Sequence, residues 1–280
     1  MNSEPAGPAE EKSRAGRNLP AAIAVGVVLG GAILVALFTV RHAFIGIVAA
    51  ALAVATWELA GALRRGGITV ALPALLIGGQ AMMWLSWPFG TDGLMVSFAL
   101  TALGCMMWRL RGGVLGYVRD TTASVLVAAY LPLFASFAVL LVLPADGAFR
   151  VLAFILTVVC SDIGGYASGV FLGRHPIAPA ISPKKSWEGL GGSLLAGIVG
   201  ATLVVVLGLD GAAWAGVLLG VAVVLTGTLG DFAESSMKRD LGVKDMGTIL
   251  PGHGGLMDRL DSLLPSAVVS WCLLTLLVPG

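Results

Sequence analysis

The feature that most constrains this chain is a series of long apolar runs separated by short polar segments. A bilayer core of about 30 Å is crossed by about 20 apolar residues in a helix, and the runs are about that long. They cover approximately residues 19–40, 42–63, 68–87, 92–110, 121–143, 149–172, 189–208, 212–233 and 263–279. The pattern predicts an all-α, polytopic membrane protein with about nine spans.

Composition excludes a soluble globular protein. Only 12% of the 280 residues are charged, whereas a soluble domain carries about 25%. The net charge of +1 indicates no particular partner. The cysteines, Cys105, Cys160 and Cys272, each lie in an apolar run, which is typical of small buried side chains and predicts neither a disulfide framework nor a thiolate metal site.

The runs also divide the chain. Residues 1–18 are polar and are predicted to form a disordered cytosolic tail. Residues 19–143 would form the N-terminal membrane helices, and residues 149–280 a C-terminal catalytic membrane domain. Only residues 88–91 separate the third and fourth runs, so these two are expected to form a tight hairpin.

Basic residues are distributed unequally between the two sides that nine spans would create. Of the 17 Lys and Arg residues, all but Arg41 and Arg150 fall on the side of the N-terminus. Lys and Arg accumulate on the cytoplasmic side of membrane proteins. The asymmetry therefore predicts a cytosolic N-terminus and places the two long connections, 173–188 and 234–262, in the cytosol.

Four carboxylates lie in or beside predicted spans: Glu58, Asp162, Asp231 and Glu234. A charge inside a span costs a few kcal/mol, so it usually faces a cavity and serves a function. Asp162 is followed by glycines, which allow a ligand or a second backbone to approach. The alternative is a packing seam with one paired Asp. Glu58 has no charged neighbour in sequence, and pairing with a basic residue is favoured over direct catalysis.

Asp231, Glu234, Ser235 and Lys238 have the spacing i, i+3, i+4 and i+7, which places them on one face of a helix. Such a stripe could hold a divalent cation and a phosphate. A solvated helix end with an internal salt bridge is the alternative, but Asp231 directly follows a long apolar run, which weakens it.

Both cytosolic connections carry polar motifs. Residues 182–189 read SPKKSWEG, so Lys184 and Lys185 stand beside hydroxyl groups in a compact cationic segment suited to phosphate. Two lysines after a span are equally well explained by the charge rule for the cytosolic side.

Residues 235–261 are more specific. Three glycines surround His253, so backbone N–H groups there could face an anion. Asp258 and Asp261 follow, and carboxylates of this kind suit Mg²⁺ with substrate phosphates. His253 could bind phosphate, act as a general acid or fix the loop. No Walker or Gly-x-Gly-x-x-Gly motif is present, so a soluble type of nucleotide fold is not indicated.

The segment 235–261 resembles the signature of the phosphatidate cytidylyltransferases (CDP-diacylglycerol synthases). The matching positions are Ser235, Met237-Lys238-Arg239, Lys244-Asp245, Gly247, Pro251, His253-Gly254-Gly255, Asp258-Arg259 and Asp261. The blocks Asp162-x-x-x-Tyr166-x-x-Gly169 and Ser182 to Gly189 are also similar to the family's, with Gly165 standing where Ala is expected. The first four runs resemble the family only in being hydrophobic.

The resemblance implies that CTP and phosphatidate react to CDP-diacylglycerol and pyrophosphate for phospholipid biosynthesis. It implies Mg²⁺, with a second metal or a monovalent ion left open, and a homodimer among membrane lipids. A multi-pass protein of the inner or plasma membrane is expected, with a cytosolic active site and no nucleic-acid partner.

The resemblance and the chemistry together assign candidate residues. The metal ligands would be Asp231, Asp258, Glu234 and Asp261, and the catalytic group would include Asp231, Asp258, Lys238, Ser235 and Asp162. The substrate-binding candidates are Lys184, Lys185, Ser182, Ser186, Glu188, Arg239, Lys244, His253 and Arg259.

Two other functions would leave different marks in the sequence. A CDP-alcohol phosphotransferase would carry an Asp-Gly-x-x-Ala-Arg type of motif, which the sequence lacks. A secondary transporter also has intramembrane carboxylates, but transporters often consist of two similar halves. Here the charges concentrate in the second half and on one face, which argues against a transporter.

Overall fold

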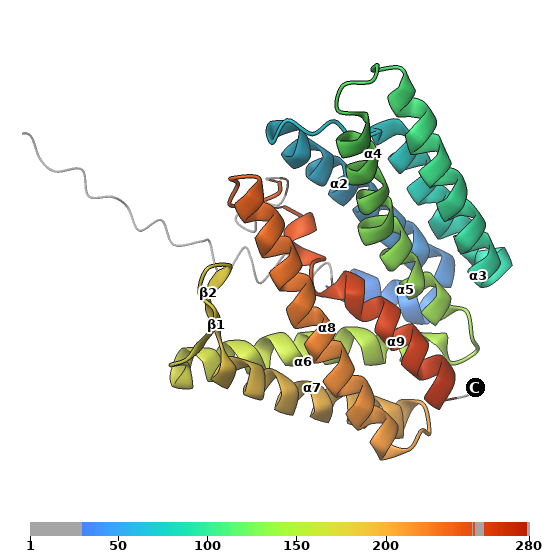
Figure 1. The fold of residues 1–280 in the computed structure, drawn as a ribbon. Coiled ribbons are helices and arrows are strands. Elements are labelled where there is room, and N and C mark those ends of the chain that lie inside the picture. The colour runs from blue at the N-terminus through green and yellow to red at the C-terminus, as the bar shows by residue number, and fades with distance from the viewer. Residues whose placement is uncertain (1–29, 248, 250–254, 279–280) are drawn as a thin grey trace, which may run out of the picture.

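A computed structural model describes residues 30–247, 249 and 255–278, and within these residues the chain is almost entirely helical (Figure 1). The main helices are α2 Arg41–Arg65, α3 Leu72–Leu110, α4 Tyr117–Ala128, α5 Phe134–Val142, α6 Gly147–Leu172, α7 Trp187–Gly208, α8 Ala213–Asp240 and α9 Leu263–Leu277. A π-helical turn, η1 Ala129–Leu133, joins α4 to α5, and a 3-10 turn, η2 Met257–Arg259, precedes α9. The predicted tail 1–18 and His253 lie outside the described residues.

The predicted class, a helical membrane protein, is confirmed. Within the described residues, six helices are long and apolar enough to cross a membrane: 41–65, 72–110, 117–142, 147–172, 187–208 and 213–240. Shorter apolar helices cover Gly30–Thr39 and Leu263–Leu277. The count of nine spans and the side of the N-terminus stay predictions.

The predicted hairpin between the third and fourth runs lies within α3. Gly90 interrupts the helix with φ 56° and ψ −136°, a backbone conformation that favours glycine. Pro88 stands two residues before it. A Cβ at Gly78, in the first half, would collide with the side chain of Thr101 in the second half. The two halves of α3 therefore pack against each other in antiparallel directions, as expected.

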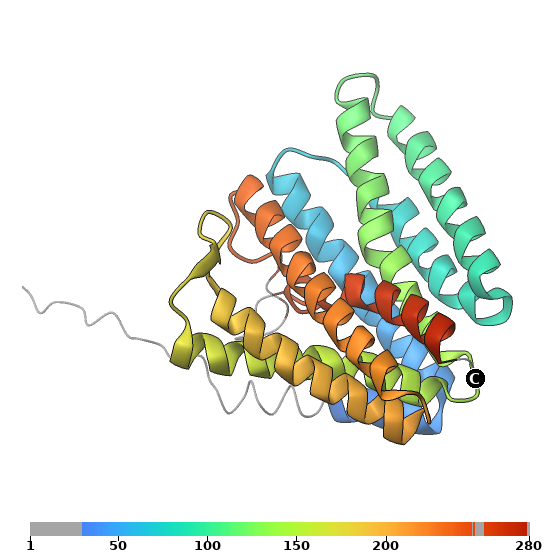
Figure 2. The ribbon, with the colours of Figure 1, turned by 60° about the horizontal axis from the view of Figure 1, so that its bottom comes forward.

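Helices α2 to α5 form one part of the molecule and α6 to α8 the other, with α9 between α8 and α5 (Figures 1 and 2). Buried apolar side chains such as Phe44, Leu131, Val151 and Leu219 form one continuous core through both parts. The core therefore joins the first part to α8 and to Met246 and Met257, which follow α8 in sequence.

Glycines bring α6 and α7 into close contact. A Cβ at Gly164 would lie 2.5 Å from the main-chain oxygen of Gly192 and 2.6 Å from the Cβ of Ala196. Larger side chains would hold the two backbones apart, which is the usual reason for small residues between membrane helices. The glycines after Asp162 therefore serve a packing seam, although Asp162 itself lies beside a cavity described below.

A short β-hairpin, β1 Pro176–Ala178 and β2 Ser182–Ser186, joins α6 to α7. Its strands are antiparallel, with Pro176 opposite Ser186 and Ala178 opposite Ser182. The sequence indicated only a polar connection over 173–188. The other predicted connection, 234–262, begins as helix, because α8 continues to Asp240. Lys184 and Lys185 thus lie on a strand, and Glu234 to Lys238 on a helix.

Candidate active site

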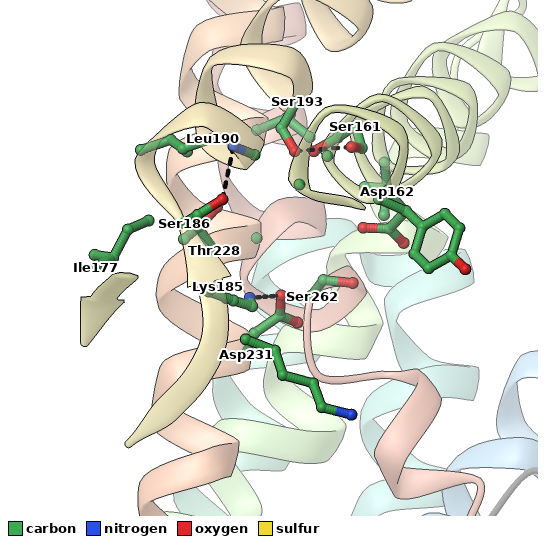
Figure 3. Close-up of a pocket in the computed structure, with 18 residues that line it drawn as sticks. Ser161, Asp162, Ile177, Lys185, Ser186, Leu190, Ser193, Thr228, Asp231 and Ser262 are labelled. Carbon is green, nitrogen blue, oxygen red and sulfur yellow. Dashed lines mark hydrogen bonds and ion pairs between the residues drawn. The ribbon is translucent and has the colours of Figure 1, made fainter. Parts of the chain in front are cut away.

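The β-hairpin is tied to α8 by an ion pair between Lys185 and Asp231 (Figure 3). The two side chains are 30% and 24% exposed. The ammonium group of Lys185 also lies 5.1 Å from the ring centre of Phe232, a distance suited to a cation–π contact. Asp231, the first carboxylate of the predicted helical stripe, therefore pairs with a lysine from a different segment of the chain.

Lys238 connects the stripe to the segment before α9. Its Nζ lies 2.6 Å from Glu234 Oε2 and 2.6 Å from Asp258 Oδ1. Glu234 is only 1% exposed, so its buried carboxyl group requires a hydrogen-bonding partner. The predicted helical spacing is confirmed, and the pairing with Asp258 brings two separate motifs together.

Asp258 is held by main-chain donors as well. The Met246 N–H lies 3.2 Å from each carboxylate oxygen, and the Gly255 N–H lies 2.8 Å from Oδ2. Burial raises the pKa of Asp258, but hydrogen bonds with Glu234, Lys238 and Gly255 outweigh it and hold the pKa below its usual range. Asp258 is therefore a fixed anion at neutral pH.

Asp261 lies beside Asp231. Burial, and then the negative charge of Asp231, raise the pKa of Asp261 to about 7. Gly230 makes this arrangement possible, because a Cβ there would collide with the main-chain oxygen of Asp261. Two carboxylates this close repel each other unless a proton or a cation is shared between them.

A cavity of 210 Å³ opens above the Lys185–Asp231 pair (Figure 3). We call it the glycine cavity, after Gly165 and Gly169 of α6, Gly189 of α7 and Gly227 of α8 in its wall. Its polar lining includes Asp162, Ser161, Ser193, Thr228 and Ser262. Ser193 donates to the Ser161 carbonyl at 2.8 Å. The predicted site residues Asp162, Lys184, Lys185, Ser186 and Asp231 all border this cavity.

A second cavity of 580 Å³ lies between the hairpin and the end of α8. We call it the lysine cavity, because Lys184, Lys238, Lys244 and Arg239 line it. Ser182 and Ser235 contribute hydroxyl groups. Lys184 borders both cavities, so a single side chain can contact ligands in each of them.

Two predicted substrate-binding residues have structural partners. Ser186 caps α7 by accepting a hydrogen bond from the Gly189 N–H at 3.1 Å. Glu188 accepts from the N–H groups of Arg174 and His175, and lies 2.6 Å from His175 Nδ1. These contacts hold the base of the hairpin. Glu188 borders neither of the two cavities.

Comparison with known proteins identifies the family. The sequence profile of the cytidylyltransferase family matches residues 20–277. The chain belongs to this family. A phosphatidate cytidylyltransferase of Mycobacterium leprae is 50% identical over 94% of this chain and 90% of its own length. The protein of the same name from Mycobacterium bovis is 48% identical over 96% of this chain and 92% of its own. A Synechocystis phosphatidate cytidylyltransferase is 45% identical over 42% of this chain.

In this cytidylyltransferase, two residues of the first part of the chain reach the carboxylates. Glu58, expected to pair with a basic residue, instead accepts main-chain N–H groups from the segment before Asp258. Tyr130, in the turn η1, was not anticipated. Its buried hydroxyl has no hydrogen-bond partner among the described residues, and it lies close enough to feel the charges of Asp261, Glu234 and Asp231. Nothing in the sequence around Tyr130 marks that proximity.

The carboxylates suit Mg²⁺ by their chemistry. Within residues 30–247, 249 and 255–278, no three His, Cys, Asp or Glu side chains are arranged to hold a metal ion by themselves. Mg²⁺ is usually held by one or two carboxylates together with substrate phosphates and water, so three are not required. The adjacent, mutually repelling Asp231 and Asp261 fit that requirement. Asp231 pairs with Lys185, and Asp258 and Glu234 pair with Lys238, so a metal ion at any of these three carboxylates would take the place of a lysine.

Proposed function

We propose that this chain is a phosphatidate cytidylyltransferase, which transfers CMP from CTP to phosphatidate for phospholipid biosynthesis. The observation that carries the proposal is the pair of adjacent cavities that share Lys184, with carboxylates and lysines between them. Both substrates are anionic phosphates, and a site for their reaction needs cations that reach each of them.

The reaction follows from the chemistry of the substrates. A phosphate oxygen of phosphatidate attacks the α-phosphorus of CTP and forms a new P–O–P bond. The bond between the α-phosphorus and its bridging oxygen to the β-phosphorus breaks, and pyrophosphate leaves. No covalent enzyme intermediate is required. The protein accelerates such a displacement by holding the two phosphates in line and by placing positive charge where negative charge develops.

The triphosphate of CTP is assigned to the lysine cavity, which carries three lysines and one arginine. The phosphate of phosphatidate is assigned to the glycine cavity, beside Lys185. That cavity lies between membrane helices α6, α7 and α8, so acyl chains can remain in the lipid. Lys184 would bridge the attacking phosphate and the α-phosphate. Arg239, Ser182 and Ser235 would fix the outer phosphates.

Mg²⁺ would be held by Asp231 and Asp261 together with substrate phosphates, and it would neutralise the charge that develops on the phosphate oxygens. Asp258 and Glu234 would keep Lys238 in the lysine cavity. Asp162 would face the bound substrate from the wall of the glycine cavity. His253, Arg259, Ser186 and Glu188 stay predicted contributors, the last two through the base of the hairpin.

We place the site on the cytosolic side of the cell membrane, because basic residues surround it and CTP is cytosolic. A cysteine introduced at Lys244 should react with an impermeant maleimide only when the cytosolic face is accessible. Labelling from the outer face of intact cells would contradict this orientation. A homodimer is also proposed, and the mass of the purified protein in detergent tests it.

The function is tested by incubating purified protein with CTP, phosphatidate and Mg²⁺ and measuring CDP-diacylglycerol. Wild type should form it, whereas Asp231→Asn should not. Asp146→Asn is the matched control, because Asp146 has a similar exposure of 28% and also pairs with a basic residue, Arg150, but borders neither cavity. Absence of product from folded wild type would overturn the proposal.

A further inference from the structure

Glu58 lies in the last third of α2, in the part of the molecule that contributes no residue to either cavity. Its side chain is 3% exposed. A buried carboxylate must be compensated by hydrogen bonds or by an opposite charge. Glu58 receives hydrogen bonds from Ile249 and Met257 of the segment before Asp258, of which residues 246, 247, 249 and 255–257 are described.

The carboxylate uses both oxygens. Oε1 accepts the Ile249 N–H at 3.4 Å, and Oε2 accepts the Met257 N–H at 3.0 Å. One side chain therefore holds two points of the segment that are eight residues apart in sequence. The second point is adjacent to Asp258.

Two glycines of the segment leave space for the Glu58 carboxylate. A Cβ at Gly247 would collide with the Glu58 carboxylate, and the three atoms nearest to it all belong to the Glu58 side chain. A Cβ at Gly255 would lie 2.8 Å from Glu58 Oε2 and 2.8 Å from Asp258 Oδ2. The glycines of the motif are thus explained in part by the close approach of a residue nearly 200 positions away.

A second contact from α2 supports the same segment. Arg65, seven residues after Glu58 and hence on the same helix face, donates to the Met246 carbonyl at 3.2 Å. The N–H of Met246 in turn donates to Asp258. Contacts therefore run from α2 through the segment to Asp258, and from Asp258 to Lys238 in α8.

We propose that Glu58 is a positioning residue, which holds the main chain at Ile249 and Met257 so that Asp258 keeps Lys238 in the lysine cavity. The expected effect on catalysis rests on the proposed function. The contact of Glu58 with Ile249 and Met257 does not depend on it. Glu58 touches no substrate in this account. It acts through Asp258, and its loss should lower kcat while leaving the substrate sites formed.

The first test is Glu58→Gln. Glutamine offers one acceptor and one donor, so one main-chain N–H then faces an NH₂ group and loses its bond. Because a displacement of about 1 Å at a site can cost about 10²-fold in rate, kcat should fall by about 10- to 100-fold. The KM values for CTP and phosphatidate should change far less. Thr56→Val is the matched control, since Thr56 is 2% exposed on the same helix and donates only to Leu52.

A second measurement needs no substrate. Hydrogen exchange of the Ile249 and Met257 amides should accelerate in Glu58→Gln relative to wild type and Thr56→Val. If wild type makes no CDP-lipid but this exchange responds, the proposed function fails and the holding contact stands. If wild type is active while Glu58→Gln keeps both its kcat and its exchange rates, the positioning role is overturned.

A third test approaches the contact from the other side, so that it does not depend on how Glu58→Gln folds. Gly247→Ala should lower kcat in the wild-type background, because its methyl group meets the Glu58 carboxylate. In the Glu58→Ala background the same substitution should cost much less, since the obstructing atoms are gone. Interacting residues give such non-additive effects. Equal costs in the two backgrounds would contradict the proposal.

Discussion

Lys185 of β2 and Asp231 of α8 form an ion pair although 46 residues separate them in sequence. The pair closes the hairpin onto the end of a membrane helix, and it lies in the wall of the glycine cavity. Lys185 belongs to the block 182–189 that is similar to the family's, and Asp231 lies four residues before the signature segment 235–261. The contact therefore brings the two blocks to one site.

Replacing Lys185 with Met should lower kcat strongly and stability only slightly. A partly exposed ion pair contributes roughly 0–1 kcal/mol to folding, whereas removal of one electrostatic group from a reacting centre costs about 10²–10³ in kcat. Rates of CDP-lipid formation and thermal unfolding in detergent measure the two effects. Arg174→Met, in the same connection but bordering neither cavity, should behave as wild type.

The two cavities predict different kinetic effects for two lysines. Lys244 borders only the lysine cavity, so Lys244→Ala should raise the KM for CTP and change the KM for phosphatidate little. Lys184 borders both cavities, so Lys184→Ala should raise both KM values. Arg64→Ala, an exposed basic residue outside the cavities, is the control. Equal effects of the two lysines on both KM values would contradict the assignment of substrates to cavities.

Gly230→Ala should destabilise the protein and impair turnover. The added Cβ meets the Asp261 main chain, which has to shift, and overpacking of this kind costs typically 1–3 kcal/mol. The shift would also separate Asp261 from Asp231. Gly61→Ala is the matched control, because no atom lies within 4 Å of its added Cβ. That control should be neutral or gain up to about 1 kcal/mol of stability. An unaltered melting temperature and rate in Gly230→Ala would refute the packing argument.

Much of the helical architecture could be predicted because it depends on local pattern. Apolar runs determine the membrane helices, and Pro88 and Gly90 mark the hairpin in α3. The residues from Asp231 to Lys238 lie on helix α8, as their spacing predicts. The β-hairpin was not predicted, since its strands are short and polar. Its second strand is tied to α8 by Lys185.

The candidate site could be predicted only as a set of residues, without their partners. Glu58 was recognised as unusual, but its partners are main-chain N–H groups, which carry no mark in sequence. Tyr130 approaches the carboxylates because η1 packs against the bundle that includes α9, which begins just after Asp261. Such proximities are set by tertiary packing between segments more than a hundred residues apart.

The central claim is that the α-phosphorus of CTP is the reacting atom. CTP carrying a labelled α-phosphate, and separately CTP carrying a labelled γ-phosphate, can be incubated with the purified protein, phosphatidate and Mg²⁺. The α-label should appear in the lipid product and the γ-label in pyrophosphate, with equal amounts of the two products. Transfer of the γ-label to lipid, or no CTP-dependent lipid product from folded protein, would contradict the account.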